Sequence, residues 1–120
     1  MTSASPDTTT WSWRVEAGER EVLVIPVLDD ANAEFSIAGW TVDAQIKTRP
    51  GGIPLYTWPA EHAQITDSGA TVTLTIPAAV STAWMFSEGW YRVEVTDPNS
   101  DPDDPNTQRI LQGPFTVDPD

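Results

Sequence analysis

A strictly alternating segment near the end of the chain, residues 89–96, constrains the fold more than any other feature. Its sequence is Gly-Trp-Tyr-Arg-Val-Glu-Val-Thr. The side chains of Tyr91, Val93 and Val95 share one face of an extended chain, whereas Trp90 and the polar residues share the other. A period of two is typical of a β-strand that buries one of its faces. The segment therefore predicts a strand with one face against a core.

The same segment resembles the start of strand F in immunoglobulin-like domains, where a tyrosine hydroxyl bonds back to nearby backbone and the residue two positions later points into the core. Here the tyrosine is Tyr91 and the later residue is Val93. Antibody domains have a disulfide-bonded cysteine at that later position, but this chain contains no cysteine. A disulfide framework and a thiolate metal site are therefore excluded, which suits a protein that folds in a reducing cytoplasm or a sandwich family that never used the bridge.

Other short segments predict further strands separated by turn signals. Residues 20–27 are a predicted strand, and the continuous apolar run within it predicts burial on both faces or a central position, with Pro26 at an edge or bulge. Residues 77–85 begin with proline and continue with alanine, which predicts one short helical turn. The remaining predicted strands are residues 11–15, 40–48, 54–58, 71–76 and 107–117, the last interrupted at 112–114.

Short strands with turn signals at this spacing predict an all-β fold. We expect a single immunoglobulin-like antiparallel β-sandwich of roughly seven or eight strands with one short helical turn. A chain of 120 residues is expected to form one domain. Residues 1–10 are rich in Ser, Thr, Pro and Asp and predict a flexible N-terminal arm. The sandwich is expected over residues 11–117, followed by a tail at 118–120.

The charge balance excludes several partners. Eighteen acidic residues stand against six basic ones, which gives a formal net charge of -12. Such a chain repels phosphate backbones and anionic membrane surfaces, so we expect neither nucleic acid nor membrane as a partner. The first ten residues have no basic start and no apolar segment of a secretory signal. We expect a soluble protein and interpret the net charge first as a source of solubility, with docking on a basic partner or binding of divalent cations as the alternatives.

The acidic loop of residues 97–106 is the candidate metal site. Its candidate oxygen ligands are Asp97, Asn99, Asp101 and Asp103. The alternate spacing matches the first positions of a calcium-binding helix–loop–helix motif. However, Pro102 occupies the position of the required glycine, and Gln108 occupies that of the bidentate glutamate. We therefore expect a solvated loop that is at most a weak Ca²⁺ candidate, and a protein without a metal or other cofactor.

Signals for catalysis are missing. His62 is the only histidine, and without cysteine it needs several carboxylates to hold zinc. No Gly-x-Ser-x-Gly nucleophile motif is present, and Gly51-Gly52 is not followed by the Lys-Ser/Thr of a phosphate-binding loop. We expect His62 to lie in an exposed loop and the protein to have no enzymatic activity.

The chain contains six tryptophans, more than a sandwich core of this size needs. Trp40 fits the core face of the strand at residues 40–48. Because tryptophan is enriched at interface cores, we expect the other five to include interaction residues. These candidates are Trp11, Trp13, Trp58, Trp84 and Trp90. The alternative is a tryptophan-rich core with partly covered surface rings.

The order of the segments resembles that of small immunoglobulin-like domains in tailed-phage virions. The resemblance covers about Trp11 to Val117, and the residues that carry it are 39–47, 71–77, 89–95 and 113–117. Such domains occur in minor tail, baseplate and head–tail junction proteins. The resemblance implies a non-catalytic structural protein that is made in the host cytoplasm and assembles with other virion proteins as a homo-oligomer or symmetric assembly. It carries over no functional residues. The single lysine and the abundance of Ala, Thr, Asp and Pro are typical of actinobacteriophages.

Two alternatives stay open from the sequence. The first is a carbohydrate-binding sandwich module that reads host-surface glycans, because exposed tryptophan rings stack on sugar faces. The second is a capsid decoration protein, although the resemblance favours the tail or head–tail region.

Overall fold

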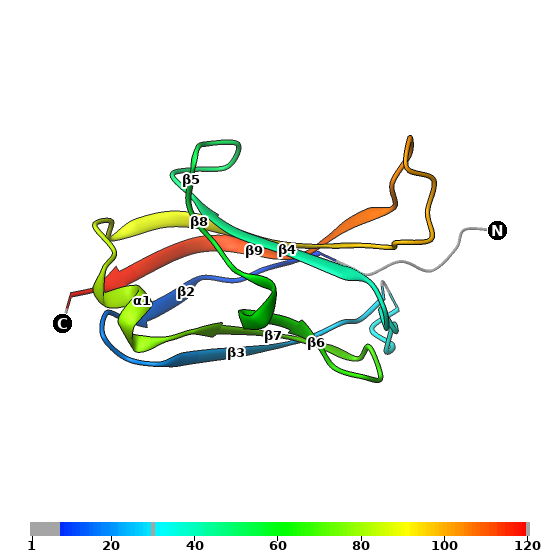
Figure 1. Ribbon diagram of the computed structural model, residues 1–120, viewed down its shortest axis with the longest axis horizontal. Helices are drawn as coiled ribbons and strands as arrows, with labels where there is room; N and C mark the ends of the chain where they lie inside the picture. Colours follow the sequence, from blue (N-terminus) through cyan, green and yellow to red (C-terminus); the bar gives the residue numbers. More distant parts are fainter. Residues whose placement is uncertain (1–7, 30, 120) are drawn as a thin grey trace.

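The computed structural model describes residues 8–29 and 31–119, which form two β-sheets packed face to face (Figure 1). The larger sheet contains β1 (Thr9–Thr10), β2 (Trp13–Glu16), β4 (Thr41–Lys47), β5 (Pro54–Thr57), β8 (Glu88–Thr96) and β9 (Thr107–Asp118). The smaller sheet contains β3 (Glu21–Pro26), β6 (Ala63–Ile65) and β7 (Thr71–Ile76). A 3-10 turn, η1 (Ala60–His62), precedes β6, and a short helix, α1 (Ala78–Thr82), follows β7.

The strand order is that of an immunoglobulin-like sandwich. The layer β3-β7-β6 faces the layer β9-β8-β4-β5. The expected all-β sandwich and the short helix after Pro77 are therefore confirmed. The sandwich is not wholly antiparallel, because β1 and β2 run parallel to β9. The sequence did not predict this pairing, because parallel strands need a long connection, and here almost the whole chain lies between them.

The alternating segments bury the faces expected of them. Tyr91, Val93 and Val95 of β8 are fully buried, and Val72 and Leu74 of β7 are fully buried in the opposite layer. β8 lies between β4 and β9 in the larger sheet, and β7 lies between β3 and β6 in the smaller one. The core therefore lies between the inner faces of two central strands, as their period of two indicated.

The last strand differs from the expectation. An interruption was expected at residues 112–114, but β9 continues from Thr107 to Asp118. Its pairing with β8 spans this point, where Gly113 lies opposite Tyr91 and Pro114 lies opposite Trp90. The interruption lies instead on the other side of β9. There β1 pairs with β9 as far as Gln112 of β9, and β2 pairs with β9 from Phe115 onward. Pro114, which has no N–H group to donate, thus lies in the gap between the β1 and β2 pairings.

The position of β3 also corrects an expectation. Its apolar run predicted burial on both faces or a central position, yet β3 is an edge strand of the smaller sheet. Val22 and Val24 point outward and are 46% and 57% exposed. The outer face of this sheet has no second layer among the described residues, so the valines stay uncovered. The expectation that Pro26 lies at an edge is confirmed.

The N-terminal segment is attached to the sandwich earlier than expected. Residues 1–7 of the expected arm lie outside the described residues. Thr8 Oγ1 donates a hydrogen bond to the Arg109 carbonyl at 2.5 Å, and Thr9 and Thr10 already form β1. At the other end, Asp118 still belongs to β9 and pairs with Arg14 at 2.8 Å. In the part of the chain described, no helix has the length and apolar character needed to cross a membrane.

Candidate functional site

An apolar groove lies along one open side of the sandwich, and we call it the seam groove. It lies between the edge strand β3 of the smaller sheet and β1 and β9 of the larger sheet. Its cavity has a volume of about 280 Å³. The large apolar side chains that line it are Trp11, Leu23, Ile25, Leu28, Ile110 and Leu111.

A β-bulge brings two successive side chains of β9 to the seam groove. Val93 of β8 pairs with Leu111, whereas Glu94 pairs with Arg109, so Ile110 is an extra residue in β9. Ile110 and Leu111 are both buried and both line the groove. Regular strand alternation would direct one of them outward. The bulge thus supplies an apolar wall that alternation does not predict.

A close backbone crossing sets the position of Trp11 at the seam groove. The Trp11 N–H donates to the Gln112 carbonyl at 2.9 Å, and the Trp11 carbonyl accepts the Tyr91 hydroxyl at 2.6 Å. A Cβ atom added to Gly113 would lie 2.1 Å from the same carbonyl oxygen, so only glycine allows this approach. The Tyr91 hydroxyl therefore bonds to the distant N-terminal segment, not to backbone near its own strand as the immunoglobulin resemblance implied.

The buried hydroxyl of Tyr91 makes stability depend on alkaline pH. Burial raises the pKa of Tyr91 above its ordinary value of 10.0. A raised folded-state pKa gives stability that is fully present below the unfolded-state pKa and is lost as the pH rises. We expect the free energy of unfolding to fall above about pH 10, by at most about 1.4 kcal/mol per pH unit for this one proton.

Urea unfolding at a series of alkaline pH values measures this slope, and the Tyr91→Phe variant is the control. Burial also raises the pKa of Tyr56, so the variant is expected to keep a shallower slope. Equal slopes in the two proteins would show that Tyr91 does not carry the effect.

Two of the predicted interaction residues are core residues instead. Trp13 and Trp58 are each only 5% exposed, and their rings stack with centroids 5.9 Å apart. Trp58 Nε1 also donates to the Thr75 carbonyl of β7 at 3.1 Å, which ties the larger sheet to the smaller one. Alternation in the predicted strand that begins at Trp11 places Trp11 and Trp13 on one face, but the break between β1 and β2 leaves Trp11 exposed and Trp13 buried.

The other tryptophans are partly buried. Trp84, after α1, stacks on Phe86 with ring centroids 5.0 Å apart, and both rings pack against the core. Trp40 was expected on the core side and packs there against Phe35. Trp90 lies on the outer face of the larger sheet, as expected from its alternation with Tyr91. Of the five candidates, Trp11 alone remains a largely exposed ring at the surface.

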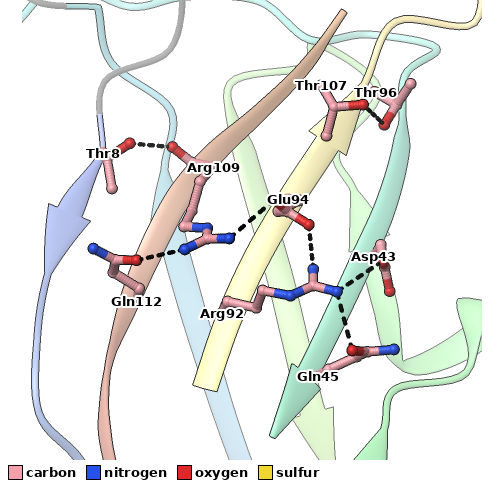
Figure 2. Close-up of polar contacts among 9 residues, drawn as sticks. All are labelled: Thr8, Asp43, Gln45, Arg92, Glu94, Thr96, Thr107, Arg109 and Gln112. Carbon is pink, nitrogen blue, oxygen red and sulfur yellow. Dashed lines mark hydrogen bonds and ion pairs between the residues drawn. The ribbon is translucent and has the colours of Figure 1, made fainter. Parts of the chain in front are cut away.

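The outer face of the larger sheet carries a polar network centred on Arg92, which Figure 2 shows. Arg92 contacts the Glu94 carboxylate, Gln45 Oε1 at 3.0 Å and Asp43 Oδ2 at 3.3 Å, and its side chain is only 12% exposed. Glu94 also pairs with Arg109 at 3.3 Å. These groups pair with one another and join β4, β8 and β9, so they stabilise the sheet.

The candidate calcium loop does not gather its oxygen ligands. Asp97 Oδ1 accepts the Asn99 N–H and Asp101 Oδ1 accepts the Asp103 N–H, each at 2.9 Å. These carboxylates therefore cap turns of their own loop. Within residues 8–29 and 31–119, no three His, Asp or Glu side chains are placed to share a metal ion. His62 ends η1, with Nε2 3.9 Å from the Glu61 carboxylate.

The fold and its surface define an immunoglobulin-like sandwich with an apolar seam. No family model and no curated protein matches the chain. The seam groove could not be predicted from the sequence, because its walls come from strands far apart along the chain. One signal was available: an apolar run over residues 22–28 that contains Pro26 belongs at a sheet edge, where part of it must stay exposed.

Proposed function

We propose that the protein is a non-catalytic assembly module that binds another protein through the seam groove. The observation that carries this proposal is the apolar groove with the exposed ring of Trp11 in its lining. The strand β3, which forms one wall of the groove, also exposes Val22 and Val24 on the outer face of its sheet. Exposed apolar surface of this kind marks binding sites in proteins that are otherwise well covered. Tryptophan at the rim of such a surface is typical of residues that dominate binding energy.

The composition of the groove supports binding rather than catalysis. Acid–base or nucleophilic chemistry needs a reactive group and its proton acceptor within hydrogen-bond reach of each other. Among the described residues that line the groove, Asp29 is the only ionisable one. Its Oδ1 atom accepts the N–H groups of Ala31 at 2.9 Å and Ala33 at 3.0 Å. The carboxylate thus shapes its own turn at the rim of an apolar surface.

We further propose that the assembly is a tailed-phage virion, in the tail or head–tail region. The support for this step is the sequence resemblance described above, carried by residues 39–47, 71–77, 89–95 and 113–117. The partners are then other virion proteins, and symmetry multiplies weak contacts into a stable ring or lattice. A capsid decoration protein would use the same surface at a different position in the virion.

Glycan binding is the second candidate function, and Trp90 supports it. This ring lies on the outer face of the larger sheet, with Lys47 opposite it on β4 and Pro114 opposite it on β9. An aromatic ring beside polar side chains is a suitable platform for a sugar ring. Because Trp90 is partly buried between these neighbours, the exposed Trp11 and its groove favour a protein partner.

The test compares two tryptophan variants in the same binding assays. The full chain is titrated with separately purified tail, baseplate and head–tail proteins encoded beside it, and its mass is followed by light scattering. We expect a complex with at least one of these proteins that weakens at least about tenfold in Trp11→Ser, equivalent to about 1.4 kcal/mol, but persists in Trp90→Ser. A strict monomer that binds none of these proteins overturns the proposal. If the chain binds host-wall oligosaccharides and Trp90→Ser loses this binding, the result supports glycan recognition as the function instead.

A further inference from the structure

We infer that the partner of the seam groove is an extended basic segment that adds to β3 as a fourth strand of the smaller sheet. This inference rests on the proposed function, since it names how the partner binds and what its chemistry is. Three observations support it: the backbone groups at the free edge of β3, the apolar cavity beside that edge, and the charge of the chain.

The hydrogen-bond pattern of β3 follows from one contact. Val27 N donates to the Ala70 carbonyl at 2.9 Å, and these two residues lie directly opposite each other when the β3–β7 register is continued. In an antiparallel pair, bonded and non-bonded positions alternate. Leu23 and Ile25 therefore bond to β7, as Val27 does. On the other side of β7, the Thr66 N–H donates to the Thr71 carbonyl, so the residues of β7 that bond toward β6 alternate with those that bond toward β3.

The intervening residues direct their backbone toward the open edge of the sheet. Val22 and Val24 alternate with the bonded positions, so their N–H and C=O groups point away from β7. Among the described residues, no backbone bond from another segment reaches these groups. A row of such groups on an edge strand is a template for an additional strand. Pro26 has no N–H and ends this row.

The seam groove lies beside this edge. Leu23, Ile25 and the Val24–Pro26 edge line one wall of the cavity, and Trp11 and Leu111 lie in the opposite wall. Alternate side chains of an added strand would point inward between these walls, because strand side chains alternate with a period of two. The backbone bonds would supply affinity, and the apolar cavity would select the inward side chains.

Charge defines the rest of the partner. The chain has a net charge of -12, and Asp29 lies in the groove lining three residues beyond Pro26, just past the end of the edge row. Within the described part of the chain, Asp29 forms no ion pair. Charge complementarity therefore favours a Lys or Arg in the incoming segment at this end. It disfavours a second copy of this acidic chain, since two such chains repel each other.

The test uses short synthetic peptides that alternate Val and Thr and end in Lys, with matched peptides that end in Glu. Binding is followed by nuclear magnetic resonance and by amide hydrogen exchange on the full chain. At saturation with the Lys peptide, exchange at Val22 and Val24 is expected to slow at least about tenfold, because new backbone bonds form there. The amides of Leu23 and Ile25, already bonded to β7, serve as internal controls. The Glu peptide is expected to bind at least about tenfold more weakly.

A backbone variant gives a second readout. Val24→Pro removes an edge N–H but no bond to β7, and proline is tolerated at edge positions. Val24→Thr keeps both the N–H and the side-chain size and is the matched control. We expect Val24→Pro to bind the Lys peptide at least about tenfold more weakly than Val24→Thr does. If Val24→Pro does not fold, the exchange rates at Val22 and Val24 in the unmodified chain still decide whether the peptide adds as a strand.

Each contrary result has a separate meaning. Peptide binding that Trp11→Ser weakens but that leaves exchange at Val22 and Val24 unchanged overturns strand addition and leaves the proposed function intact. Equal binding of the Lys and Glu peptides overturns the basic character of the partner. Failure of both peptides to bind overturns the inference, whereas the proposed function fails only if the purified virion proteins also do not bind.

Discussion

Replacing Trp13 with alanine is expected to lower the free energy of unfolding by about 3–5 kcal/mol, the range for removing a buried tryptophan. The ring of Trp13 lies between the sheets and packs against three buried rings. Its centroid is 5.9 Å from that of Trp58, 5.6 Å from that of Tyr91 and 5.3 Å from that of Phe115. These neighbours come from separate segments of the fold and cannot all close on the space left behind. Urea unfolding followed by circular dichroism measures the loss.

Trp11→Ala is the matched control, because it removes the same side chain from the same segment at a position that is 44% exposed. We expect this variant to lose less than about 1.5 kcal/mol, as is usual for a substitution outside the core. If Trp13→Ala cost no more than Trp11→Ala and impaired partner binding instead, Trp13 would be an interaction residue after all.

Gly113→Ala is expected to destabilise the protein by about 2–4 kcal/mol, which combines the strain of an overpacked site with the loss of a buried hydrogen bond. The added Cβ would lie 2.1 Å from the Trp11 carbonyl oxygen and 2.8 Å from its carbonyl carbon. Both are backbone atoms, so the clash cannot be relieved by a side-chain rotation. The N-terminal segment must move away from β9, and the Tyr91 hydroxyl then loses its acceptor. Thermal and urea unfolding measure the change.

Gly39→Ala separates this close approach from the general cost of replacing a glycine. Gly39 has φ +82°, and an added Cβ would meet nothing within 4 Å. Its substitution is expected to cost only the backbone strain of a left-handed residue, about 1–2 kcal/mol. A smaller loss in Gly113→Ala than in Gly39→Ala would mean that the crossing at Trp11 relaxes without cost.

The crossing at Gly113 also links stability to the seam groove. The Trp11 carbonyl accepts the Tyr91 hydroxyl from the core, while the Trp11 ring lines the groove at the surface. Displacing this segment therefore moves one wall of the groove. For this reason, the binding experiments use Trp11→Ser, which changes the ring and leaves the backbone contacts in place.

The position of the candidate site, the seam groove, could not be predicted from the pattern of residues along the chain. Alternation identified the buried faces of β7 and β8, and proline and glycine identified most turns, because each signal acts within a few residues. The same logic placed Trp90 on the outer face of the larger sheet. The prediction made from tryptophan content did not anticipate the burial of Trp13 and Trp58, because tryptophan content alone does not say how much space the two sheets enclose.

The sequence by itself determined the strands, their inward faces and the class of fold, since the period of two is a property of each extended segment. Tertiary structure alone decided that β3 faces β1 and β9 across the groove, that β1 and β2 pair with the last strand, and that a bulge turns both Ile110 and Leu111 toward the groove. These features depend on which segment lies beside which. A neighbour that is distant along the chain leaves no mark on the local pattern of side chains, so only the folded arrangement reveals the open edge where a partner would bind.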